Sequence, residues 1–193
     1  LAHLAFPEGA RADSGVRTSD TISPFYDPMI AKIITHGPSR AVALKRMARA
    51  LAETQVAGTV TNLSFLGALC AHEGFAAGDV DTGLIGRDLD SLVQAPLPSD
   101  EERALAALVA LGLTGAGWPT GFHLWSAMKR QVRLSFKDEA FDVVVESLNE
   151  AAHDVSFGDT RVEARCVGGR WRLNGQLAPD AMLKDGKAYV FAQ

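Results

Sequence analysis

The hydrophobic pattern of the first half alternates between extended and helical segments. Residues 11–36 contain two β-favouring stretches, and the second, Met29–Thr35, has the short branched character of a buried strand. Residues 39–54 follow with apolar side chains at helical spacing and charged side chains on the other face. A second helix is expected to begin near Asn62, a residue type that favours N-caps, and to stop before Gly74. The first half therefore predicts a small sheet packed with helices.

A linker and a second pattern follow. Residues 93–99 contain two prolines and no periodicity, which is typical of a linker. Ser99 and Glu102 have the spacing of a capping box, and the helix they predict runs to Leu111. From Ala104 onward this helix is apolar on every side, so we expect it to be enclosed by other elements.

The remainder of the chain has the alternation of β-strands. We expect residues 113–130 to form a loop, followed by strands joined by tight turns. The alternating apolar positions are Val132, Leu134, Phe136, Phe141, Val143, Val145, Val162, Ala164, Cys166, Trp171 and Leu173; the turn signals are Asp138-Glu139, Gly168-Gly169, Asn174-Gly175 and Asp185-Gly186. This pattern predicts an antiparallel meander wrapped around the apolar helix, as a partial β-barrel. The fold class is therefore α+β.

Composition and charge narrow the function classes. The chain has 193 residues, 47% of them hydrophobic, which is enough for a folded core. Residues 1–99 carry 8 basic and 10 acidic side chains, and residues 100–193 carry 11 and 13, so no half has the basic excess expected of nucleic-acid binding. No apolar run approaches the roughly 20 residues of a membrane helix. The two cysteines, Cys70 and Cys166, lack zinc-site spacing and indicate a reducing compartment.

Several short motifs occur together in the first half. They are Arg11–Arg17 (RADSGVR), Tyr26–Lys32 (YDPMIAK), Gly37–Arg40 (GPSR), Ala50-Leu51 with Gly58 and Thr61-Asn62, Phe65-Leu66, and Phe75 with Gly78 and Thr82. In this order they resemble the C-terminal lobe of biotin carboxylase. Asp81–Ile85 (DTGLI), with Trp118 and Trp125 downstream, is similar to the α subunits of bacterial methylcrotonyl-CoA carboxylases.

The resemblance implies a domain plan and an activity. It implies a carboxylase lobe over residues 1–92, a linker over 93–99 and a bridging domain over 100–193 that ends within its barrel. The implied reaction is ATP- and bicarbonate-dependent carboxylation of biotin, followed by transfer to an acyl-CoA, 3-methylcrotonyl-CoA by the finer similarity. Biotin, ATP and Mg would be bound outside this chain, which would be inactive alone. The implied partner is a carboxyltransferase β subunit, in the cytoplasm or, for a eukaryotic protein, the mitochondrial matrix.

Other interpretations of the whole chain stay open. A free-standing polypeptide of this kind could be a non-catalytic assembly module that docks on a carboxyltransferase. Propionyl-CoA or geranyl-CoA could replace methylcrotonyl-CoA, because no residue of the chain specifies the acyl group.

Arg11 is the candidate catalytic residue. The resemblance implies that this arginine contacts bicarbonate and stabilises the enolate form of the biotin ureido ring. A guanidinium suits both planar anions, since it is permanently charged and offers a fork of donors. Asp13 is the candidate supporting residue. The alternative is a surface arginine that pairs only with Asp13.

Interface candidates come from both halves of the chain. His36 and Arg40 stand where the family often builds a homodimer contact; their alternatives are a loop histidine and a solvated arginine at a helix start. Trp125 is a candidate anchor for the β subunit. Lys129 follows Ala127-Met128 as in the biotin attachment motif, but an attachment lysine needs an exposed hairpin tip, so we assign it no biotin. No residue pattern predicts a metal site.

Overall fold

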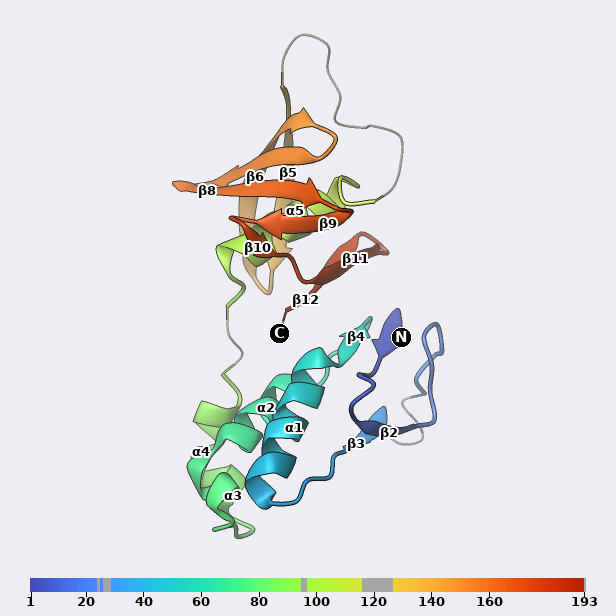
Figure 1. The fold of residues 1–193 in the computed structure, drawn as a ribbon, viewed down its shortest axis with the longest axis vertical. Coiled ribbons are helices and arrows are strands. Elements are labelled where there is room, and N and C mark those ends of the chain that lie inside the picture. The colour runs from blue at the N-terminus through green and yellow to red at the C-terminus, as the bar shows by residue number, and fades with distance from the viewer. Residues whose placement is uncertain (24, 26–28, 95–96, 116–126, 193) are drawn as a thin grey trace. The chain divides into compact units, whose positions relative to one another are not determined.

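The computed structural model describes residues 1–23, 25, 29–94, 97–115 and 127–192. They form two compact units, Leu1–Pro96 and Leu97–Ala192, which we call unit 1 and unit 2 (Figure 1). The elements of unit 1 are β1 (His3–Ala5), β2 (Arg11–Ser14), β3 (Ala31–Ile34), α1 (Arg40–Glu53), β4 (Gln55–Ala57), α2 (Leu63–Ala71), α3 (Glu73–Ala77) and α4 (Leu84–Leu92).

Two short antiparallel ladders lie in the described part of unit 1. β2 pairs with β3, so that the two β-favouring stretches of the sequence lie side by side as expected. β1 pairs with β4, and neither of these three-residue strands was predicted, because so short a segment shows no periodicity.

The first helix agrees closely with its prediction. α1 spans Arg40–Glu53, and the hydroxyl of Ser39 accepts a hydrogen bond from the backbone N–H of Val42 at 3.4 Å. Its buried residues are Ala50 and Leu51, on the apolar face that the sequence shows. α1 packs against α2, α3 and β3.

Two glycines of unit 1 permit close backbone approaches. A Cβ on Gly37 would lie 2.7 Å from the backbone nitrogen of Ala43, so only glycine lets this loop lie against α1. Gly58 has a φ of +93°, and a Cβ there would lie 2.5 Å from the backbone nitrogen of Ala2. The motif glycines at these positions are therefore required by the backbone.

The helices after α1 are shorter and less regular than the pattern predicted. α2 begins after Asn62, as expected, but the Asn62 side chain makes no capping hydrogen bond. α3 and α4 were not predicted. α3 has only five residues, too few to show a helical period, and α4 contains a non-helical residue at Asp88.

The described residues of unit 2 form one helix and eight strands. They are α5 (Asp100–Ala110), β5 (Met128–Phe136), β6 (Glu139–Asn149), β7 (Ala152–Phe157), β8 (Thr160–Val167), β9 (Arg170–Leu173), β10 (Gln176–Leu177), β11 (Asp180–Lys184) and β12 (Lys187–Phe191). The capping box at Ser99 and Glu102 is confirmed, with both reciprocal hydrogen bonds present.

The strands form an antiparallel meander. Six of them pair in the order β10-β9-β8-β7-β6-β5, and β11 with β12 forms a separate hairpin. Positive φ angles occur at Gly168-Gly169, Asn174-Gly175 and Asp185-Gly186, which confirms these three turns. The first turn is one residue earlier than predicted, since Lys137 has the positive φ and Phe136 pairs with Glu139.

Two further details differ from the prediction. Residues 128–130, expected in a loop, belong to β5. β7 was not predicted, because its sequence (AHDVSF) does not alternate between apolar and polar residues. Three successive residues are buried, His153, Asp154 and Val155, whereas a strand with one solvent-exposed face buries every second residue.

The core of unit 2 surrounds α5. Ala104, Ala107 and Leu108 are fully buried, and α5 contacts β5, β6, β7 and β8 as well as the β11–β12 hairpin. The expected enclosure of this helix is therefore present. A closed barrel is not shown: the described strands pair as the six-stranded sheet and the hairpin, with no ladder joining the two. No helix in the described ranges is long and apolar enough to cross a membrane.

Candidate functional site

The β2–β3 ladder presents one charged face to solvent. Arg11 lies opposite Ile34, and Asp13 lies opposite Lys32. Directly opposed residues of an antiparallel pair share a face, as do residues two apart on one strand. All four of these residues are exposed, whereas Ala12, between the two charged residues of β2, is not. The ladder therefore brings Arg11, Asp13 and Lys32 together on one surface.

Arg11 and Asp13 form a bidentate ion pair on this face. Nε of Arg11 donates to Oδ1 of Asp13 at 2.9 Å, and Nη2 donates to Oδ2 at 3.0 Å. The hydrogen bonds from Arg11 lower the pKa of Asp13, and Lys32 adds to this effect by its charge. Asp13 is therefore ionised at neutral pH, and it fixes the direction of the guanidinium.

The ion pair leaves capacity to bind a further anion. A guanidinium has about five N–H groups, and two of them bind Asp13. Among the described residues no other hydrogen bond to this guanidinium is present, and the Arg11 side chain is 73% exposed. The structure thus brings the predicted catalytic and supporting residues into contact, with donors directed to solvent.

Arg40 links two helices of unit 1. Its Nε donates to the carbonyl of Ala76 at 3.1 Å, its Nη2 donates to the carbonyl of Phe75, and the guanidinium lies 5.2 Å from the centre of the Phe75 ring. These carbonyls belong to the last turn of α3, where Gly78 has a φ of +87°. Two motifs that are 35 residues apart in sequence therefore meet.

The other predicted interface residues are less informative. His36 is exposed between β3 and α1, and its backbone carbonyl accepts a hydrogen bond from Arg46 at 2.7 Å. Trp125 lies outside the described residues. A role of His36, Arg40 or Trp125 in subunit contact stays a prediction.

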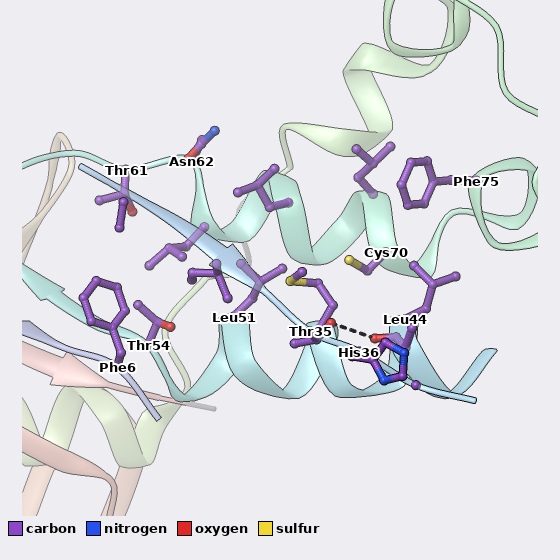
Figure 2. A pocket seen from close by; sticks show the side chains of 18 of the residues that line it. Phe6, Thr35, His36, Leu44, Leu51, Thr54, Thr61, Asn62, Cys70 and Phe75 are labelled. Carbon is purple, nitrogen blue, oxygen red and sulfur yellow. Dashed lines mark hydrogen bonds between the residues drawn. The ribbon is translucent and has the colours of Figure 1, made fainter. Parts of the chain in front are cut away.

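A cavity of about 630 Å³ lies within unit 1 (Figure 2). Side chains of α1, including Leu44 and Leu51, and of α2, including Cys70, line it. The hydroxyl of Thr35 in its wall donates to the carbonyl of Ala43 at 3.1 Å. Its lining is mostly apolar, so it offers packing surface and few groups that could do chemistry.

Cys70 is the one thiol in the cavity wall. Burial raises its pKa, so the thiol stays protonated and is a poor nucleophile. The second cysteine, Cys166, is also free and is half-buried in β8.

Unit 2 holds a buried carboxylate that the sequence did not single out. Asp154 on β7 is 4% exposed and binds Nη2 of Arg161 at 2.6 Å and Nη2 of Arg165 at 3.0 Å. Burial alone would raise the pKa of Asp154, but the hydrogen bonds from the two arginines outweigh it, and the pKa is lowered. This cluster connects β7 with β8.

His153, its neighbour, faces the core. It is 1% exposed, its Nδ1 lies 3.0 Å from the hydroxyl of Ser147, and its ring stacks on Trp171 with centroids 5.3 Å apart. Burial, with the nearby charges of Arg130 and Arg165, lowers the pKa of His153, which keeps it neutral. Its neutral ring is part of the packing of the sheet.

Other candidate chemistry in unit 2 has a structural explanation. Lys129 is the second residue of β5, and its Nζ lies 3.6 Å from a carboxylate oxygen of Glu146. It therefore lies within a paired strand, not at a hairpin tip. Within the described ranges no group of three or more His, Cys, Asp or Glu side chains could hold a metal ion.

Sequence reasoning did not single out Lys32, the third charged residue of this exposed face. The alternation of Met29–Thr35 places Lys32 on the solvent-facing side of the strand, which could be predicted from the sequence. The position of Lys32 opposite Asp13 could not be predicted, because 16 residues separate Ser14 from Ala31 and leave the register unspecified.

Comparisons with known proteins show which family and which proteins the chain is similar to. Residues 1–87 match the family described as biotin carboxylase C-terminal domain. The mitochondrial methylcrotonoyl-CoA carboxylase subunit alpha of Dictyostelium discoideum is 39% identical over 163 residues, covering 76% of this chain and 23% of that protein. The propionyl-CoA carboxylase alpha chain of Ruegeria pomeroyi is 40% identical over 101 residues, covering 52% of this chain and 15% of that protein.

A solved structure supports the fold. The pyruvate carboxylase of Rhizobium etli matches with a TM-score of 0.51 and 24% identity, covering 69% of this chain and 13% of that chain. The chain thus spans less than a quarter of the length of each of these three proteins. Residues 1–87, with the β2–β3 ladder and the helices that follow it, belong to the biotin carboxylase C-terminal domain family.

Proposed function

We propose that this chain is part of the α subunit of a biotin-dependent acyl-CoA carboxylase and that Arg11 acts in the carboxylation of biotin. The observation that carries the proposal is the exposed guanidinium of Arg11, oriented by Asp13 and with donors to spare, in a biotin carboxylase C-terminal domain. Fixed positive charge at a point where negative charge develops lowers a barrier, by about 3 kcal/mol for one donor.

Arg11 has the chemistry that the reaction asks of it. Bicarbonate and the enolate of a ureido ring are both planar anions, and a guanidinium fork matches their oxygen atoms in plane. Asp13 holds two N–H groups on one edge of the fork. The free edge is the one that would face the anion.

The relatives favour methylcrotonyl-CoA as the acyl substrate. The alignment with the Dictyostelium methylcrotonoyl-CoA carboxylase subunit covers 76% of the chain, more than unit 1 alone contains, so it extends into unit 2. The alignment with the propionyl-CoA carboxylase chain covers 52%. Propionyl-CoA is therefore the second candidate.

The cofactors of the reaction would be held by residues outside this chain. Biotin would contribute the ureido group that accepts the carboxyl group, and Arg11 fits the charge of the enolate form of that group. ATP and Mg would be bound outside this chain as well, in keeping with a sequence that contains no glycine-rich phosphate loop.

Unit 2 would serve assembly. We propose that its strands complete a barrel around α5 and that this barrel docks on a carboxyltransferase β subunit, with Trp125 as one anchor. The contact of α5 with both the six-stranded sheet and the β11–β12 hairpin supports the barrel. The compartment would be the cytoplasm, or the mitochondrial matrix in a eukaryote, as the relatives named mitochondrial suggest.

The test is Arg11→Lys in the intact subunit. Lysine keeps the charge but loses the fork, so we expect biotin carboxylation to fall by about a hundredfold while the fold is kept. The measurement is bicarbonate-dependent ATP hydrolysis with free biotin as acceptor.

The chain offers a matched control in Arg49→Lys. Arg49 is also an exposed arginine in a carboxylate pair, with Nε 2.6 Å from Oε1 of Glu53, but it belongs to α1 and not to the ladder. This variant is expected to keep the wild-type rate. A wild-type rate for Arg11→Lys as well would refute the role of Arg11.

A further inference from the structure

His72 is the single residue between α2 and α3, and it caps both helices. Its backbone N–H donates to the carbonyl of Leu69 at 3.2 Å, in the last turn of α2. Its side chain caps the start of α3, where the ring nitrogen Nδ1 accepts a hydrogen bond from the backbone N–H of Phe75 at 3.3 Å. Ser, Thr, Asp and Asn are the residues preferred at such a position, and none of them changes charge near neutral pH. The cap of α3 therefore has a property that an ordinary cap lacks.

The other ring nitrogen of His72 contacts α4. Nε2 lies 3.1 Å from Oδ2 of Asp88, the residue at which α4 departs from helical φ and ψ. An ionised carboxylate only accepts hydrogen bonds, and Nδ1 already accepts one from Phe75, so the single proton of the neutral ring lies on Nε2. Both contacts are satisfied together by this one tautomer of the neutral imidazole.

A second proton on the ring changes the two contacts in opposite directions. An imidazolium has two N–H donors and no acceptor, so Nδ1 can no longer accept from Phe75, and two N–H groups then face each other. The contact with Asp88 becomes a charge-assisted hydrogen bond and gains strength. Protonation of His72 therefore removes the cap of α3 and leaves the ring bound to α4.

Charged and titratable side chains near His72 come from four helices. They are Arg40 of α1, Cys70 of α2, Glu73 of α3, and Arg87 and Asp88 of α4. Arg40 binds carbonyls in the last turn of α3, and Arg87 pairs with Asp81 at 2.9 Å. Among the described residues Asp88 alone forms an ion pair with His72, so a proton that the ring takes up has this carboxylate as its counterion.

We propose that His72 is a pH-sensitive cap: its neutral ring keeps α3 closed near neutral pH, and its protonation opens α3 in mild acid. The charge of a histidine ordinarily changes between about pH 5 and 8, which gives the range in which this occurs. The last turn of α3 also binds the guanidinium of Arg40 through the carbonyls of Phe75 and Ala76. The opening of α3 therefore releases Arg40, a residue predicted at a subunit interface.

The first experiment follows amide hydrogen exchange in the full chain, with wild type beside His72→Asn. The amides of Phe75, Ala76 and Gly78 are read, because each donates a hydrogen bond at α3. Asparagine caps helices through a side-chain oxygen that takes up no proton in this range, so the variant keeps an acceptor at every pH. Wild type and variant are compared at the same pH, which cancels the intrinsic pH dependence of exchange.

The loss of one capping hydrogen bond sets the expected effect. We expect the protection of these amides in wild type, relative to His72→Asn, to fall by about three- to tenfold between about pH 7.5 and about pH 5.5. A ratio that stays constant over this range would overturn the proposal. If His72→Asn does not fold by circular dichroism, the wild-type NMR signal of Hε1 on His72 gives a second test. Its titration must coincide with the loss of protection, and a different midpoint would reject the cap.

Two further variants separate the ring from its surroundings. Asp88→Asn removes the counterion of the imidazolium, so the loss of protection should move to lower pH. A midpoint at or above that of wild type would reject the contact with Asp88 as part of the device. His36→Gln removes an exposed histidine between β3 and α1 and should leave the wild-type profile unchanged. A flat profile in His36→Gln would assign the pH change to that residue and overturn the proposal. None of these measurements depends on catalytic activity, so the proposed role of Arg11 is tested separately.

Discussion

The two units use their apolar residues in opposite ways. In unit 2, α5 and the strands β6 to β9 bury a continuous core, with Leu108 and Leu173 almost fully enclosed. In unit 1, α2 is nearly all apolar in sequence (LSFLGALCA), yet none of its residues is buried, and a cavity of about 630 Å³ lies beside it. Apolar composition therefore does not measure how complete a core is.

The charged residues of the two units also differ in how deeply they are buried. The Arg11–Asp13 ion pair, one of several in unit 1, is exposed and keeps free donors. The carboxylate of unit 2, Asp154, is buried beneath two arginines. An exposed ion pair contributes little to the stability of the fold, so its side chains are available to bind a ligand. Removal of a buried carboxylate leaves its charged partners unpaired and destabilises the fold.

The largest effect on stability is expected from Leu108→Ala. Leu108 is 0% exposed, and its truncation leaves a cavity around α5, so unit 2 should lose about 3 kcal/mol of unfolding free energy. Leu66→Ala, in the half-covered α2 beside an existing cavity, should cost less than half of that. Urea titration gives both numbers.

The signals of the two units can be separated in that titration. All three tryptophans of the chain lie in the sequence of unit 2, so tryptophan fluorescence follows unit 2 alone. The ellipticity at 222 nm is dominated by unit 1, which has four of the five helices in the described parts of the chain. Equal losses for the two leucines would contradict the difference in core closure.

Asp154→Asn should have the next largest effect. Its removal leaves Arg165 without its buried partner and should cost unit 2 about 2 kcal/mol, less than a fully buried pair because Arg161 is 65% exposed. The lowered pKa of Asp154 fixes the pH dependence: its contribution is complete above the ordinary value of 3.8 and is lost as pH falls through the lowered value.

Stability measured between pH 7 and pH 2 checks this sign. The difference between wild type and Asp154→Asn should be constant near neutrality and should vanish in acid. A difference that grows in acid would show that the two arginines do not hold the pKa down.

The smallest effect on stability is expected at the N-caps. Ser99→Ala removes one arm of a complete capping box, with bonds of 3.2 and 2.8 Å, and should cost about 1 kcal/mol. Ser39→Ala removes a single bond of 3.4 Å in unit 1 and should cost less. Urea midpoints followed by fluorescence and by ellipticity test the order, and a larger loss at Ser39 would reverse it.

Much of the fold could be predicted because local signals suffice for it. The helix of unit 2 has a capping box, an apolar surface on every side and a glycine after its end, and the turns that follow carry Gly-Gly or Asn-Gly pairs. β7 could not be predicted, because the burial of Asp154 depends on arginines of the next strand. The strand propensity of an aspartate does not show that arginines of the next strand will pair with it.

Two of the three charged residues of the β2–β3 face were predictable as a pair, and the third was not. Arg11 and Asp13 are two apart on a strand, so alternation alone places them on one face. Lys32 joins them only through the register of β2 and β3, which a 16-residue connection does not specify. The same holds for Arg40 and Phe75, whose contact depends on how α1 and α3 pack.

The contacts of Arg40 with the carbonyls and ring at the end of α3, which we call the Arg40 clamp, also bear on the order in which unit 1 loses structure. Closing a loop of about 35 residues costs roughly 3 kcal/mol of chain entropy, more than one exposed guanidinium returns. The packing of α1 against α2 must therefore supply the closure, and the clamp forms on an already assembled pair. We therefore expect the five-residue α3 to open before α1, and hydrogen exchange of the two helices can test this order.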